Sequence, residues 1–378
     1  MTITPDDVAS LTSRLVAIDS VNPSLVPGGA GEGEIARFVA GWARDAGLEA
    51  TVLEHTAGRP SVLVRAAGTG GGRTLLLCGH LDTVGAEGVA APRIEGDRLH
   101  GRGGYDMKAG VAAALLAARE AGGLALRGDV LVAAVADEEH ASLGVQEVLQ
   151  AVRADAAIVT EPTELQVAVA HKGFVWSEIE VTGRSAHGSR PHLGVDAIVK
   201  AGPILAGLRE LDAVLAGREH PLLGRGSVHA SRISGGTEMS SYPDRCVIGL
   251  ERRTLPDESA STLEAELDEL LGRCRAADPQ LDASHRTLLV REPFEVEADA
   301  GVVHVVRDAA AGVLGTPPPP VGGVSYWADS AFIAAAGIPT VLFGPTGAGA
   351  HAVDEWVSLS ATHAVARTLV AAAERICA

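Results

Sequence analysis

The feature that most constrains the fold is a set of short, uninterrupted apolar runs between stretches of helical periodicity. The runs are TLLLC from Thr74, DVLVAAVA from Asp129 and AAIVT from Ala156. Continuous apolar runs are typical of strands buried on both faces, because helices cover both sides of a parallel sheet. Helix-like stretches cover residues 8–19, 32–46, 107–121 and 143–152. This part of the chain predicts an α/β domain with a mostly parallel sheet flanked by helices.

The pattern changes from about Phe174 to Leu289. Segments such as VWSEIEV and SVHASRI alternate polar and apolar residues, which is typical of a sheet with one exposed face. Helical stretches cover residues 195–211 and 257–274, and after PTVLFG a closing helix covers 356–376. We therefore expect one α/β domain made from residues 1–173 and 290–378, with a smaller α+β domain, residues 174–289, inserted into it.

Composition limits the class of function. The 378 residues are 47% hydrophobic and 21% charged, which suffices for two folded domains. A net charge of −17 disfavours nucleic acid and anionic membranes as partners. The four cysteines form no C-x-x-C pair, the start of the chain lacks a secretory pattern, and AGVAAALLAA is shorter than the ~20 residues that span a bilayer. We expect a cytoplasmic protein with neither nucleic-acid nor membrane partners.

Ionisable side chains follow each apolar run. Ligands of open α/β sheets bind at the carboxyl ends of the strands, so these side chains are predicted to meet at one edge. Singly, each one could be a helix cap or a turn residue, but clustered acids are costly unless they are paired or metal-bound. The residues are His80 and Asp82, the segment Asp137–His140, Glu161, His351, and Asp106 at the start of a helix.

This group of side chains favours a metal site. Two imidazoles with several carboxylates and no thiolate suit Zn²⁺, Co²⁺ or Mn²⁺, and one carboxylate can bridge two ions about 3.5–4 Å apart. On an extended chain His80 and Asp82 face the same side, so Asp82 can fix the tautomer of the imidazole. Glu138 and Glu139 would point to opposite sides, which predicts one ligand and one free general base.

The motifs GHLDTV, GRGGYDMKAG, DEE, TEPT and GAGAHAVDEWV, in this order, resemble those of the co-catalytic zinc amidohydrolases and metallopeptidases. That family includes acetylornithine deacetylase, succinyl-diaminopimelate desuccinylase, aminoacylase and glutamate carboxypeptidase, and the resemblance covers nearly the whole chain. It implies a catalytic domain with two divalent metal ions, Zn²⁺ ahead of Co²⁺ or Mn²⁺, and an inserted lid that also forms a homodimer. The implied reaction is hydrolysis of the amide bond of an N-acyl amino acid; the alternative is a metallo-exopeptidase acting on dipeptides or C-terminal residues.

The resemblance also implies residue roles in the catalytic domain. Asp106 would bridge the two ions, Asp82 would orient a ligand, and Glu138 would be the general base. His140, next to the glutamates, is a competing ligand that the completed set disfavours. The implied ligands are His80 and Glu161 on one ion and Glu139 and His351 on the other.

In the lid, GRSAHGSRPHLG resembles the family's G-x-S-A-H segment and implies that His187 donates to the oxyanion, reaching in from a partner subunit. ERRTLP resembles its arginine motif, so Arg253 would hold the substrate carboxylate, while Arg252 is expected to be solvated. Ser240 stands at a substrate-contacting position where asparagine is common in the family, and Ala328 stands where threonine is common. These differences bear on the substrate rather than on the metals.

Two other classes of function are disfavoured. A vestigial binding protein would have lost a ligand or the base, yet every implied position carries a competent residue. A dinucleotide site is excluded because GTGGG and GRGG lack the G-x-G-x-x-G spacing.

Overall fold

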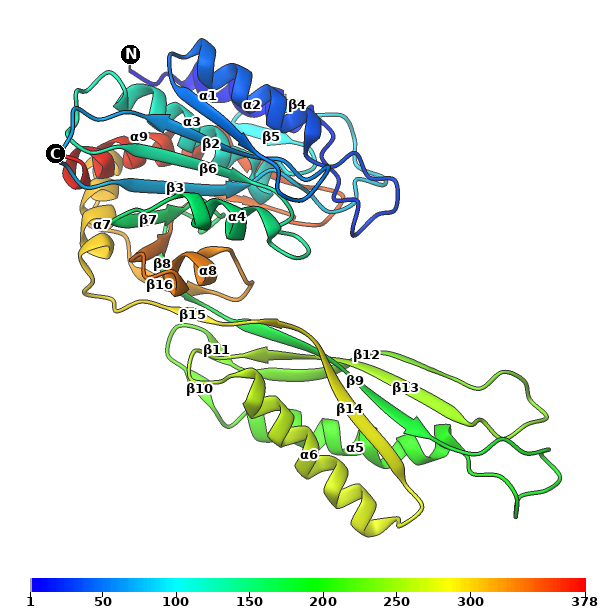
Figure 1. The fold of residues 1–378 in the computed structure, drawn as a ribbon. Coiled ribbons are helices and arrows are strands. Elements are labelled where there is room, and N and C mark those ends of the chain that lie inside the picture. The colour runs from blue at the N-terminus through cyan, green and yellow to red at the C-terminus, as the bar shows by residue number, and fades with distance from the viewer. Residues whose placement is uncertain (1) are drawn as a thin grey trace. The chain divides into compact units, whose positions relative to one another are not determined.

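The computed structural model describes residues 2–378, and contacts within it divide the chain into two compact units (Figure 1). The first unit contains the chain up to Val169, Val296–Gly322 and Ala328–Ala378; the second contains Ala170–Glu295 and Gly323–Trp327. The predicted boundaries are 173/174 and 289/290, and residues 323–327 are predicted in the outer domain rather than in the insert, where the contacts place them. Across residues 2–378, no helix has the length and apolar character needed to cross a membrane.

The first unit is built on a mostly parallel sheet, as predicted. Its strand order is β1-β2-β6-β3-β7-β17-β8, with parallel pairs joining β6 to β3, β3 to β7 and β7 to β17. The three apolar runs form β3, β6 and β7, whose residues are all buried. The strands are β1 (Glu49–Leu53), β2 (Ser61–Ala66), β3 (Leu75–His80), β6 (Val130–Val135), β7 (Ala156–Val159), β8 (Val167–His171) and β17 (Thr340–Leu342).

Helices flank this sheet (Figure 1). Helix α3 packs against β3 and β6, and both α1 and α9 pack against α3. The Ala-rich run of α3 is therefore buried around nearly its whole circumference, which explains its high apolar content. The helices are α1 (Pro5–Val16), α2 (Gly33–Asp45), α3 (Ala109–Ala121), α4 (Leu143–Ala151), α7 (Gly301–Leu314), α8 (Ser330–Ala335) and α9 (Leu359–Ile376).

The first residues of two predicted helices, 107–121 and 356–376, belong to other elements. A π-helical turn, η1 (Gly104–Lys108), precedes α3. Residues Trp356–Ser358 form strand β19, and the Ser358 hydroxyl then accepts the N–H of Ala361, which caps α9. Strand β19 belongs to a small sheet with β4 (Arg93–Glu95), β5 (Arg98–His100) and β18 (Gly347–Ala348).

The second unit is an antiparallel sheet with helices on one face, as the alternating pattern predicted. Its strand order is β12-β13-β9-β14, and α5 and α6 cover one face through a core that includes Ile179, Ile248 and Leu267. The elements are β9 (Gly173–Thr182), α5 (Ala197–Leu215), β12 (Ser227–Gly235), β13 (Arg245–Thr254), α6 (Ala260–Ala277) and β14 (Asp282–Arg291). Shorter strands are β10 (Glu219–His220) and β11 (Gly224–Arg225), which pair with each other, and β15 (Phe294–Glu295) and β16 (Val321–Val324), which pair with β8 of the large sheet.

The expectation that Arg252 is solvated is wrong. Its side chain is 1% exposed and forms ion pairs with Glu258 at 2.5 Å and Glu266 at 3.2 Å. Successive side chains of a strand point to opposite faces, so Arg252 of β13 turns toward the helix-covered face. A charge can be buried there because two carboxylates meet it.

The packing of the central strand predicts a large effect of truncation. Leu77→Ala in β3, where Leu77 is fully buried, should lower the free energy of unfolding by ~2–5 kcal/mol through lost burial and the cavity left behind. Leu124→Ala makes the same chemical change at a side chain that is 38% exposed and should cost much less. Denaturant unfolding followed by circular dichroism measures both; equal losses would contradict this account of the core.

Candidate metal centre

The carboxyl ends of the parallel strands gather the predicted ligands at one edge of the sheet. His80 is the last residue of β3, and the glutamates of the DEE motif lie just beyond β6. Glu161 follows β7, and His351 lies on the loop beyond β17. Asp106 comes from the π-helical turn before α3. Segments far apart in the sequence therefore meet at one place because parallel strands end together.

The two oxygens of Asp106 face different histidines. Oδ1 lies 3.1 Å from Nε2 of His80, and Oδ2 lies 3.2 Å from Nε2 of His351. Glu161 approaches the first imidazole at 3.7 Å, and Glu139 approaches the second at 3.2 Å. The donor atoms fall into two groups that share Asp106: His80, Asp106 and Glu161, and Asp106, Glu139 and His351.

These donors fit divalent cations. Each group offers one imidazole nitrogen and two carboxylates with their donor atoms within 4.8 Å of one another, a mixed N/O set that suits Zn²⁺ and similar ions. Oε1 of Glu139 is buried and, within residues 2–378, accepts no hydrogen bond. A buried carboxylate oxygen without a partner is costly, and a cation would relieve that cost. His140 belongs to neither group and has an exposed side chain.

The charges in the cluster shift one another's pKa values. Burial raises the pKa of Glu138 well above its usual range, and the charge of Glu161 adds to the shift. Burial alone would raise the pKa of Asp106, but hydrogen bonds to His351 and His80 bring it below its usual range. The bonds to Asp106 and Glu139 raise the pKa of His351 to about 10. Strongly perturbed groups clustered at a sheet edge are typical of a functional site.

Glu138 and Glu139 lie differently with respect to the donor groups. Glu139 belongs to the second donor group, whereas Glu138 belongs to neither. The carboxylate of Glu138 lies 4.0 Å from Nε2 of His80 and is 10% exposed. It is therefore a buried carboxylate beside the donor groups, the placement that a general base requires.

Asp82 contacts His80 in a different way from that expected. Nδ1 of His80 hydrogen-bonds to the main-chain oxygen of Asp82 at 2.9 Å, and the carboxylate lies 3.6 Å away. The carboxylate instead accepts the backbone N–H groups of Glu138 and Glu139 at 3.1 and 3.2 Å. Either contact holds the imidazole in place, but the carboxylate is directed to the DEE segment.

Glu355 is a supporting residue of the site that the sequence pattern does not predict. Its buried carboxylate accepts the N–H groups of Tyr105 at 3.0 Å and Asp106 at 3.1 Å, and it forms an ion pair with Arg102 at 2.5 Å. Glu355 thus fixes the turn that presents Asp106. Its position in the GAGAHAVDEWV motif points to a place near the site. Its role could not be predicted, because the groups that its carboxylate contacts are about 250 residues away in sequence.

Close backbone contacts fix Glu161. A Cβ on Gly344 would lie 1.9 Å from the carbonyl oxygen of Glu161, and one on Gly110 would lie 2.1 Å from that of Thr160. Only glycine allows these approaches. The Thr160–Glu161 turn is therefore held between α3 and the end of β17.

The remaining predicted residues belong to the second unit. The loops that carry His187 and Ser240 are paired, since Gly188 N–H donates to the Ser240 carbonyl at 2.7 Å and His187 bridges to Ser241. Both loops lie beyond Thr182, the last residue of β9. Arg253 pairs with Phe174 at the other end of that strand, where its guanidinium contacts Glu251 at 2.7 Å and the Phe174 ring at 5.1 Å.

Two relatives cover most of the chain. An acetylornithine deacetylase from Myxococcus xanthus is 30% identical over 314 residues, which is 80% of this chain and 77% of the relative. One from Klebsiella pneumoniae is 29% identical over 369 residues, which is 92% of this chain and 89% of the relative.

Solved structures share the fold. Aminopeptidase PepT from Bacillus cereus superposes with a TM-score of 0.82 at 22% identity over all of both chains. Bacillus subtilis YxeP, a dinuclear metal binding peptidase from the M20 family, gives 0.77 at 15% identity over 99% of this chain and 98% of its own. The model of peptidase family M20/M25/M40 matches residues 76–375. With its fold and most of its length matched, the chain belongs to peptidase family M20/M25/M40 and is a metal-dependent hydrolase.

Proposed function

We propose that this hydrolase removes the acyl group from an N-acyl amino acid, as an acetylornithine deacetylase-like deacylase. The two-metal chemistry is supported mainly by the position of Asp106, whose two oxygens face two separate imidazoles. The acyl amino acid is favoured over other amides because the acetylornithine deacetylases match 80–92% of the chain at 29–30% identity. A cytoplasmic location remains a prediction from the sequence.

Asp106 would bridge two ions, for which we propose Zn²⁺ ahead of Co²⁺ or Mn²⁺. His80 and Glu161 would complete one site, and Glu139 and His351 the other. Bound ions of this kind polarise a carbonyl group and make water more acidic. The absence of thiolate from both donor groups accords with these metals.

Glu138 would move the proton. Its carboxylate would take a proton from the attacking water as the water oxygen bonds to the substrate carbonyl carbon. It would then pass that proton to the nitrogen as the C–N bond breaks, giving a carboxylic acid and an amine. The burial that raises the pKa of Glu138 suits a group that must both accept and release a proton near neutral pH.

His187, Ser240 and Arg253 would act on the substrate, but not all from the same subunit. From Phe174, beside Arg253, to Thr182, before the His187 loop, β9 spans roughly 26 Å at 3.3 Å per residue. A small acyl amino acid cannot contact both ends of this sheet at once. We propose that Arg253 holds the substrate carboxylate, while His187 donates to the developing oxyanion and Ser240 contacts the same substrate from the partner subunit of a homodimer.

Adjacent glutamates give the first test. Glu138→Ala should retain two metal ions per chain but lower kcat by ~10²–10⁴, because the proton shuttle is lost. Glu139→Ala should lose an ion from the site that it shares with His351. Metal analysis and steady-state kinetics on both variants measure this; near-normal turnover of Glu138→Ala would refute the mechanism.

A substrate panel gives the second test. Zinc- or cobalt-loaded enzyme should hydrolyse N-acetyl amino acids faster than simple dipeptides, and turnover should vanish with chelator and return with metal. Preference for dipeptides would select the exopeptidase alternative. Two bound ions without turnover of either class would reject the substrate class and keep the metal sites.

Subunit mixing tests the role of His187. His187→Ala should lower kcat with metal content unchanged, whereas His192→Ala, at an exposed histidine of the same loop region, should not. Co-expressing His187→Ala with Glu138→Ala should restore about a quarter of wild-type activity, because half of the randomly formed two-fold dimers would carry one complete site. No recovery, or a fully active monomer in sedimentation, would place His187 outside the partner's site.

A further inference from the structure

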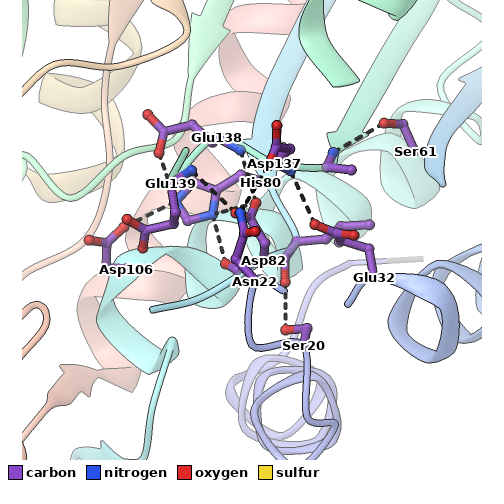
Figure 2. A network of polar contacts seen from close by, with 12 residues as sticks. Ser20, Asn22, Glu32, Ser61, His80, Asp82, Asp106, Asp137, Glu138 and Glu139 are labelled. Carbon is purple, nitrogen blue, oxygen red and sulfur yellow. Dashed lines mark hydrogen bonds and ion pairs between the residues drawn. The ribbon is translucent and has the colours of Figure 1, made fainter. Parts of the chain in front are cut away.

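The segment that carries Glu138 and Glu139 is held by side chains rather than by a strand or helix. Four consecutive backbone N–H groups donate to side-chain oxygens (Figure 2). Ala136 donates to Ser61 at 3.1 Å and Asp137 to Glu32 at 3.2 Å. Glu138 and Glu139 donate to the two oxygens of Asp82. The position of this segment therefore depends on the residues that fix Ser61, Glu32 and Asp82.

Asp137 is the point where this segment is fixed most firmly. Its φ of +68° lies in the left-handed region, which a non-glycine residue keeps only when its surroundings demand it. Its Oδ1 lies 2.8 Å from Nη2 of Arg59 and accepts the Asn22 amide at 3.0 Å. Its carbonyl accepts the N–H of Ala141 at 3.0 Å. Contacts from both directions thus hold Asp137 in a conformation that turns the chain toward the donor groups.

Arg59 is the cation of this network. Its guanidinium forms a two-pronged pair with Glu32, at 2.6 Å from Nη2 to Oε1 and 2.8 Å from Nε to Oε2. The Arg59 side chain is 8% exposed, and those of Glu32 and Asp137 are fully buried. Asn22 connects Asp137 with Asp82, because its side-chain amide, which donates to Asp137, also donates to Asp82 at 2.7 Å. Without the guanidinium, two buried carboxylates would face each other uncompensated.

We propose that Arg59, together with Glu32 and Asn22, is a positioning residue that acts through Asp137 to place Glu139 as a ligand and Glu138 as the base. The inference rests on the proposed function, since it assigns a metal to the Asp106–Glu139–His351 group. Within the part of the chain that the structure describes, the Arg59 guanidinium contacts Glu32, Ser24 and Asp137 rather than His80 or Glu161. Its loss should therefore weaken one of the two metal sites selectively.

Arg59→Met removes the cation and keeps much of the side-chain volume. Zinc-loaded wild type and variant are equilibrated with graded chelator, and bound zinc is counted by atomic emission. We expect the variant to release one ion at ~10–100-fold lower chelator concentration than wild type, the usual effect of losing an outer-shell partner, and to keep the other ion at the wild-type midpoint. With both sites refilled by excess zinc, kcat should fall while KM stays near the wild-type value, because Glu138 is displaced and the substrate-binding residues are not.

Arg252→Met is the matched control. Like Arg59→Met, it removes a buried guanidinium that forms ion pairs with two carboxylates, but this guanidinium lies in the second unit. It should lower the thermal stability of the chain without changing either zinc midpoint. Arg59→Lys restores the charge but not the two-pronged geometry, so its zinc midpoint should lie between those of Arg59→Met and wild type.

The outcomes separate the two proposals. If wild type binds two zinc ions and Arg59→Met keeps both midpoints, or loses both ions together, the positioning role is wrong and the proposed function stands. If wild type binds no zinc, both fail. Should Arg59→Met not fold, Asn22→Ala, which leaves the Arg59–Glu32 pair intact, must show the same selective loss; wild-type midpoints there would overturn the inference.

Discussion

Burial of like charge is the constraint on which the rest of the first unit depends. Asp106, Glu138, Glu139 and Glu161 converge at one sheet edge, and burial raises the pKa of three of them. Such a cluster is tolerated only where opposite charge or hydrogen-bond donors meet every oxygen. The surrounding structure supplies the imidazoles of His80 and His351, and the orphaned oxygen of Glu139 is left for a cation.

The same constraint explains why the supporting groups are themselves ionic. Glu355 fixes the Asp106 turn and is balanced by Arg102; Glu32 and Asp137 fix the DEE segment and are balanced by Arg59. Carboxylates serve here because they accept backbone N–H groups of irregular segments: Glu355 accepts two, and Glu32 accepts that of Asp137. These carboxylates then need a guanidinium nearby, since an unpaired buried charge would destabilise the fold, and Arg59 serves both Glu32 and Asp137.

The second unit meets a different requirement. Its one-sided sheet packs α5 and α6 on one face and leaves the other open. His187 and Ser240 lie beyond one end of the strands and Arg253 lies at the other end, so the length of the strands separates them. The proposed homodimer rests on this separation, since one small substrate that needed all three residues would take them from two copies of the sheet.

The sequence by itself determined the order and kind of the buried strands, because burial on both faces requires continuous apolar runs. It also gave the candidate ligand set, because parallel strands end together and family-like motifs stand at those ends. It could not place Arg252, whose face depends on strand register, nor the hydrogen bonds of Asp82, which depend on where the DEE segment turns. Arg59, Glu32 and Asn22 carried no local signal: each is an ordinary polar residue in sequence, and only the tertiary structure brings them against Asp137. The general reason is that burial pattern is periodic along the chain, whereas the pairing of buried charges is decided between segments remote in sequence.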